Sequence, residues 1–199
     1  MIQNLILDMG NVLIEFSPDR FISDLGVKDP RIHEILLREI FRSPEWVALD
    51  HGDLDEDAAL RQICSRLPED LWWMAEKLVF HWNEPLHPIP GMRELVRDCK
   101  AAGMGIYLLS NASVRQKVYW PDVPGSEWFD GVVVSADVKL CKPDPAIYQY
   151  LLDTYRLNPR KCLFVDDMRY NVDGAEVVGI PAFHFQNNAD KLRRRIFGQ

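Results

Sequence analysis

Two adjacent acids, Asp166 and Asp167, directly follow the apolar segment at residues 163–165. Neighbouring carboxylates at the end of a buried strand repel each other unless a cation or a hydrogen-bond network compensates their charge. Helix N-capping would explain one of the two acids and leave the other unexplained. Carboxylate oxygens are also the ligands that Mg²⁺ binds in proteins. The pair therefore indicates a site for a hard divalent cation.

A third acid, Asp8, follows the apolar segment at residues 5–7 and precedes a turn that contains Gly10. An Asp-x-Gly-Asn turn is a common way for a chain to leave a strand, so this segment alone does not require a function. If the strands that precede these acids lie in one sheet, however, Asp8 and the acid pair together supply several oxygen ligands for the same cation.

Two further polar features also lie close to apolar segments. Ser110 and Asn111 follow the segment at residues 106–109 and precede a helix, where their side chains and N–H groups could bind an anion. Simple N-capping explains either residue singly. Lys142 lies in a short loop, stiffened by Pro143, and a lone lysine is most often solvated. It is the joint order of acid, hydroxyl, lysine and acid pair that predicts a functional site.

The elements that position these residues form an α/β pattern. Short segments that are apolar throughout are typical of strands covered on both faces of a parallel sheet. Helical patterns separate most of them, for example at residues 92–102 and from Asp144 onward. The alternation predicts a Rossmann-like, doubly wound, mostly parallel sheet, in which ligands bind beyond the carboxyl ends of the strands. The four apolar segments lie at residues 5–7, 106–109, 132–134 and 163–165.

One stretch interrupts the alternation. Between about Pro18 and Pro85 no strand pattern occurs, and the apolar spacing is helical. The predicted division is an α/β core of residues 1–16 and 86–199, with a helical insertion of residues 17–85 after the first strand. The helical segments of the insertion are predicted at residues 30–42, 55–66 and 69–82.

Composition limits the partners of the chain. The net charge of −7 argues against nucleic acid, which is held by basic surfaces. No apolar run approaches the roughly 18 residues that a membrane span requires. The first residues carry no basic leader, so we expect a cytoplasmic protein. The 4 cysteines include no C-x-x-C pair and are predicted to be buried thiols, with no zinc site and no disulfide.

Four motifs, in this order, resemble those of the haloacid dehalogenase-like (HAD) hydrolases. The resemblance extends from residue 4 to about residue 185, and the helical insertion falls where such proteins carry a helical cap. Within the superfamily the sequence is most similar to bacterial α-D-glucose-1-phosphate phosphatases and to the N-terminal phosphatase domain of soluble epoxide hydrolases. The motifs are D-x-G-N-V at 8–12, L-L-S-N at 108–111, S-x-x-x-x-x-x-K-P at 135–143 and F-V-D-D-x-x-x-N at 164–171.

The resemblance implies a magnesium-dependent phosphatase for a small phosphorylated metabolite such as a hexose 1-phosphate. Asp8 would attack phosphorus and form an aspartyl-phosphate. Ser110 and Asn111 would bind phosphoryl oxygens, and Lys142 would stabilise the nucleophile and the developing charge.

The same resemblance implies a metal site. Mg²⁺ would be held by Asp8, the main-chain carbonyl of Gly10 and Asp167. Asp166 would belong to the same metal site and contact these ligands without binding the ion directly.

One position departs from the family pattern. Most phosphatases of this superfamily carry a second Asp two residues after the nucleophile as general acid and base, and here that residue is Gly10. General acid–base catalysis typically contributes about 10²–10⁴-fold to the rate. Either the substrate has a good leaving group, or a residue of the cap donates the proton. His51 and His81 are the cap candidates.

The residues also allow other interpretations. A dehalogenase shares the fold and lacks the second Asp, but it needs no metal and therefore no acid pair. A phosphonate hydrolase needs a cap lysine, for which only Lys28 and Lys77 are available, and a phosphomutase is disfavoured by the missing Asp. A catalytically impaired phosphate-binding or regulatory protein is the alternative of a different class.

Four cap tryptophans could stack on a sugar, although packing in the core is the more usual role. They are Trp46, Trp72, Trp73 and Trp82.

Overall fold

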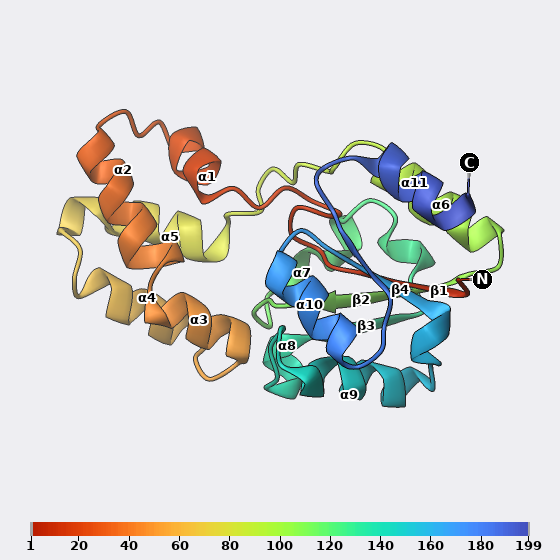
Figure 1. The fold of residues 1–199 in the computed structure, drawn as a ribbon. Helices are drawn as coiled ribbons and strands as arrows, with labels where there is room; N and C mark the ends of the chain where they lie inside the picture. Colours follow the sequence, from red (N-terminus) through yellow and green to blue (C-terminus); the bar gives the residue numbers. More distant parts are fainter. Residues whose placement is uncertain (1, 199) are drawn as a thin grey trace.

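The computed structural model describes residues 2–198, and its centre is a five-stranded sheet (Figure 1). The strand order is β3-β2-β1-β4-β5, and every neighbouring pair is parallel. The prediction of a doubly wound, mostly parallel α/β fold is therefore confirmed. The strands are β1 (Asn4–Leu7), β2 (Gly105–Ser110), β3 (Gly131–Val134), β4 (Cys162–Asp166) and β5 (Ala182–His184).

Helices cover both faces of the sheet because successive side chains of the buried strands point to opposite sides. In β1, Leu5 and Leu7 pack with α6 and α11, whereas Ile6 packs with α9 and α10. All three side chains are fully buried. The helices of the core are α6 (Met92–Ala101), α7 (Gln116–Tyr119), α8 (Ser135–Val138), α9 (Pro145–Tyr155), α10 (Arg169–Val177) and α11 (Ala189–Phe197). Short 3₁₀ turns lie at Trp120–Asp122, Ser126–Trp128 and Pro159–Lys161.

The stretch without strands forms a helical unit beside the sheet, joined to it by two lengths of chain (Figure 1). This unit has its own apolar cluster, which includes Ile22, Ile40 and Ile63. Asp55 caps α4 by accepting a hydrogen bond from the Ala58 N–H. The helices are α1 (Pro18–Asp24), α2 (Pro30–Leu36) with a π-helical turn (Leu37–Phe41), α3 (Pro44–His51), α4 (Glu56–Cys64), a 3₁₀ turn (Glu69–Leu71) and α5 (Trp72–Phe80).

The helical unit touches the core where α3 meets α8. Gly52 ends α3 with a φ of 77°, and a Cβ atom there would lie 2.3 Å from the carbonyl oxygen of Ala136. The Ser135 hydroxyl donates a hydrogen bond to the main-chain oxygen of Asp50. The end of α3 is therefore fixed against the core at a position that only glycine fits.

The four cysteines are free thiols, but only Cys99 and Cys162 are buried, while Cys64 and Cys141 are half-buried. The prediction of buried thiols thus holds for two of the four. Cys64 is at the end of α4 in the helical unit, and Cys141 lies where the core meets the end of α3. Within residues 2–198, none of the helices combines the length and the apolar character that crossing a membrane demands.

Candidate active site

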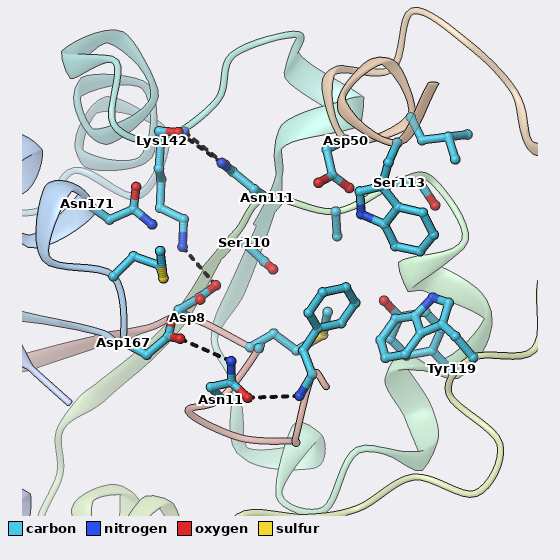
Figure 2. Close-up of a pocket in the computed structure, with 18 of the residues that line it drawn as sticks. Asp8, Asn11, Asp50, Ser110, Asn111, Ser113, Tyr119, Lys142, Asp167 and Asn171 are labelled. Carbon is cyan, nitrogen blue, oxygen red and sulfur yellow. Dashed lines mark hydrogen bonds and ion pairs between the residues drawn. The ribbon is translucent and has the colours of Figure 1, made fainter. Parts of the chain in front are cut away.

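The polar residues singled out in the sequence meet at the carboxyl edge of the sheet. Asp8 directly follows β1, Ser110 ends β2 and Asp166 ends β4. Asp8, Ser110 and Asp167, together with residues of the helical unit, line a cavity of about 300 Å³ (Figure 2). The helical unit contributes Trp46, Leu49, Asp50, Val79 and Trp82 to its walls.

Lys142 lies at the centre of a buried charge cluster. Its Nζ atom lies 2.8 Å from Oδ1 of Asp8 and 2.6 Å from Oδ2 of Asp166. Burial alone would lower the pKa of Lys142, but the two carboxylates raise it above its ordinary value, so the amine stays charged. Burial raises the pKa of Asp8 to about 7, although Lys142 opposes this rise. One ammonium group does not balance the neighbouring acids, and the site has room for a further positive charge.

Asp166 is fully occupied by protein donors. Its Oδ1 accepts hydrogen bonds from the Met168 N–H at 2.8 Å and from Nδ2 of Asn171 at 3.1 Å. Its Oδ2 accepts from Lys142 at 2.6 Å and from the same Asn171 amide at 3.2 Å. The Asp166 side chain is wholly buried. This carboxylate therefore orients Lys142 and the start of α10.

Three carboxylates converge closely enough to hold a metal ion. Asp8, Asp166 and Asp167 each offer one oxygen, and these oxygens lie within 4.8 Å of one another. The amide of Asn11 donates to Oδ2 of Asp167 at 3.1 Å and accepts from the Phe16 N–H at 2.9 Å, which fixes the turn after β1. An all-oxygen donor set suits a hard cation. The residues present therefore fit the predicted metal site.

The predicted anion ligands have different surroundings. Ser110 is buried, and its hydroxyl points into the pocket near Asp8 (Figure 2). The Asn111 amide instead binds the main chain of Lys142, donating to its carbonyl at 2.9 Å and accepting from its N–H at 2.8 Å. The sequence motif did not indicate this role. The Asn111 side chain positions Lys142, and of the two predicted anion ligands it is the Ser110 hydroxyl that has no hydrogen-bond partner within residues 2–198.

The histidines predicted as proton donors lie outside the pocket. Nδ1 of His51 lies 2.7 Å from Oδ2 of Asp53, and Nδ1 of His81 lies 3.0 Å from Oε1 of Glu84. Neither ring is among the residues that line the cavity. This prediction is wrong because the two rings face acidic partners on the surface. Asp50, the residue before His51, enters the pocket instead.

Two of the four tryptophans reach the pocket. Trp46 and Trp82 line it, whereas Trp72 and Trp73 are exposed elsewhere on the helical unit. Because Asp50 lies four residues after Trp46 on α3, the two side chains share one helix face. The sequence alone does not single out Asp50, because the face of α3 that meets the pocket is set by the contacts of α3 with the core.

Comparisons with known proteins agree with this geometry. The family model for haloacid dehalogenase-like hydrolases matches residues 2–179. The sesquiterpene phosphatase astK of Aspergillus oryzae is 27% identical over 192 residues, which cover 92% of this chain and 89% of the relative. The D-ribitol-5-phosphate phosphatase of Bacteroides thetaiotaomicron is 24% identical, over 96% of this chain and 95% of the relative. A HAD family enzyme from Bacteroides thetaiotaomicron, solved as a magnesium complex, superposes with a TM-score of 0.74 at 21% identity, covering 97% of this chain and 98% of that chain.

The chain therefore belongs to the haloacid dehalogenase-like hydrolases. It is a hydrolase of the phosphatase type, as the four motifs predict. The narrower resemblance to glucose-1-phosphate phosphatases stays a prediction.

Proposed function

We propose that the chain is a magnesium-dependent phosphatase that hydrolyses a small organic phosphate through a covalent intermediate on Asp8. The observation that carries this proposal is the convergence of Asp8, Lys142 and the acid cluster around one pocket. A metal-independent dehalogenase would have no use for the acid cluster, so the cluster favours phosphoryl transfer.

The chain's own residues account for both chemical steps. Asp8 attacks phosphorus, an oxygen–phosphorus bond forms, and the bond to the leaving oxygen breaks. Water then attacks the phosphorus of the aspartyl-phosphate, which releases inorganic phosphate and regenerates the carboxylate. Lys142 holds Asp8 in place at 2.8 Å and stabilises charge on the transferring group, and the Ser110 hydroxyl donates to a phosphoryl oxygen.

Asp8, the Gly10 carbonyl and Asp167 are the residues that would hold Mg²⁺. Asp166 would not bind the ion directly, because its oxygens already accept hydrogen bonds from Lys142 and Asn171. When bound, the ion supplies positive charge that neutralises the phosphoryl oxygens.

The helical unit, residues 17–85, acts in this proposal as a cap that closes the pocket and selects the leaving group. Trp46 and Trp82 line the pocket, and stacking of a sugar ring on an aromatic side chain supports a sugar phosphate such as a hexose 1-phosphate. The apolar walls formed by Leu49 and Val79 favour a second candidate, a hydrophobic alcohol phosphate like that implied by the name of the sesquiterpene phosphatase relative.

The test is phosphate release from p-nitrophenyl phosphate and from a panel of sugar and prenyl phosphates. We expect activity with Mg²⁺, loss of activity with a chelator, and loss in Asp8→Asn. Asp57→Asn is the matched control, since it makes the same chemical change at an exposed position of the cap. Phosphate release that persists in Asp8→Asn, or that does not depend on a divalent ion, contradicts the proposal. The panel separates the two substrate classes.

A further inference from the structure

The pocket contains one carboxyl group that the roles assigned above leave unused. Asp50, near the end of α3, lines the cavity, and Figure 2 shows its carboxyl group directed from the cap towards the space in front of Ser110. Within residues 2–198, no hydrogen bond or ion pair involves the Asp50 side chain, although its main-chain oxygen is bound by the core. The side-chain oxygens are therefore available to a bound molecule.

The position of Asp50 is fixed by the core although the residue belongs to the cap. Its main-chain oxygen accepts a hydrogen bond from the Ser135 hydroxyl and lies 3.7 Å from the Cys141 sulfur. Two residues later, Gly52 packs so tightly on Ala136 that no side chain fits between them. Asp50 is thus held over the sheet edge by contacts with residues that directly follow β3 or precede α9.

The in-line geometry of phosphoryl transfer places the leaving oxygen on the side of the pocket opposite Asp8. The attacking and leaving oxygens lie roughly in line with phosphorus, so the leaving group departs on the side opposite the nucleophile. Asp8 faces the pocket from the sheet, and Asp50 faces it from the cap (Figure 2). A carboxyl group at Asp50 is therefore on the side where the leaving oxygen needs a proton.

We propose that Asp50 is the general acid and base of this phosphatase and supplies from the cap what Gly10 lacks. The proposal rests on the function proposed above. In the first step the Asp50 carboxyl gives its proton to the departing oxygen, so that a neutral alcohol leaves. In the second step the Asp50 carboxylate accepts a proton from the water that attacks the aspartyl-phosphate, and the carboxyl group is restored.

The surroundings of Asp50 suit this cycle. Burial raises the pKa of Asp50 to about 7, the charge of Asp8 adds to the rise, and Lys142 lowers it. Tyr119 and Cys141, the other titratable groups near it, have pKa values raised by burial and stay neutral. A carboxyl group with such a pKa is present in both protonation states near neutral pH, as a group that alternates between acid and base must be.

Packing does not explain the glycine at the usual position of the acid. A Cβ atom at Gly10 would meet only the Cβ of Phe16, at an ordinary contact distance of 3.5 Å. A side chain at residue 10 is therefore not excluded at its first atom, and Asp50 offers a carboxyl group from a different part of the same pocket.

The decisive experiment is a leaving-group series measured on Asp50→Asn, Asp50→Glu and the control Asp57→Asn. The series runs from p-nitrophenyl phosphate to phosphates of simple alkyl alcohols. For Asp50→Asn we expect kcat/KM to fall about 10²–10⁴-fold with alkyl phosphates and far less with p-nitrophenyl phosphate, whose leaving group needs no proton. Asp50→Glu, which keeps the acid, recovers part of the alkyl activity, and Asp57→Asn behaves as the wild type.

An equal loss across the whole series in Asp50→Asn, or no loss at all, overturns the role of Asp50. Either result leaves the phosphatase proposal intact as long as activity still requires Asp8. Absence of phosphate release from every ester, or activity that survives in Asp8→Asn, overturns the proposed function itself.

Discussion

The contact between Gly52 and Ala136 predicts that one methyl group at residue 52 disturbs catalysis from outside the pocket. In Gly52→Ala the new Cβ would lie 2.3 Å from the Ala136 carbonyl oxygen and 2.9 Å from its carbonyl carbon and Cα. These are backbone atoms, so the overlap is relieved only if the end of α3 moves. Asp50 lies two residues away and moves with it.

The loss of stability expected in Gly52→Ala is the sum of two free-energy costs. A residue with a Cβ in the left-handed region costs about 1–2 kcal/mol. Overpacking against the core adds about 1–3 kcal/mol. Gly26→Ala isolates the first cost, because Gly26 has a φ of 80° and a Cβ atom there would meet nothing within 4 Å. A misplacement of about 1 Å at a catalytic group lowers the rate about 10²-fold. We therefore expect kcat/KM for alkyl phosphates to fall about 10²-fold in Gly52→Ala. Gly26→Ala should keep wild-type activity.

The assay combines urea denaturation, for the free energy of unfolding, with kcat/KM for an alkyl phosphate and for p-nitrophenyl phosphate. Equal stability and equal activity of Gly52→Ala and Gly26→Ala would refute this prediction. It is also refuted if Gly52→Ala loses stability while its alkyl phosphatase activity stays at the level of the wild type.

Three further outcomes follow from the same contacts. Lys142→Met leaves two buried carboxylates without their partner and should lower the free energy of unfolding by about 3–5 kcal/mol in urea denaturation without added metal. Arg66→Met removes both hydrogen bonds, each 2.8 Å long, to the buried Glu45 and should cost about 1–3 kcal/mol at pH 7. Because Arg66 lowers the pKa of Glu45 below 4.5, this difference in stability is present above that pH and disappears as the pH falls and Glu45 becomes protonated. Gly10→Asp, combined with Asp50→Asn, should recover at least about tenfold of the alkyl phosphatase activity by returning an acid to the pocket.

Matched variants at exposed positions serve as controls. Lys161→Met removes a lysine that is exposed, and Arg169→Met removes an exposed partner of Asp173. Each should change the free energy of unfolding by less than about 1 kcal/mol. If the Lys142 or Arg66 variant is no less stable than its control, the assigned contacts do not stabilise the fold as described. If Arg66→Met is still less stable than the wild type by the same amount at pH 3, the difference does not come from the ion pair of Arg66 with ionised Glu45.

The gathering of the acids at the carboxyl edge of the sheet could be predicted from the sequence, because the end of a strand is a local feature. Asp8 and the pair at residues 166–167 each follow an apolar run, and parallel strands bring such ends to the same side. β5 was not predicted, since three half-buried residues at the edge of a sheet carry little apolar pattern.

The missed features depend on tertiary packing. Which cap residue reaches the pocket is decided by the contact of α3 with α8, and no spacing within the cap encodes that contact. The neighbouring residues Asp50 and His51 differ in role for this reason. In the same way, the Asn111 amide is turned towards the main chain of Lys142 by a loop that lies 31 residues further along the chain.

A crystal structure of the chain with Mg²⁺ and fluoroberyllate tests the central claim most directly. The account predicts a beryllium–oxygen bond to the Asp8 carboxylate, with Asp167 bound to the ion and Lys142 beside the fluorides. Fluoroberyllate bound at another residue, or Mg²⁺ held without Asp8 and Asp167, would contradict it.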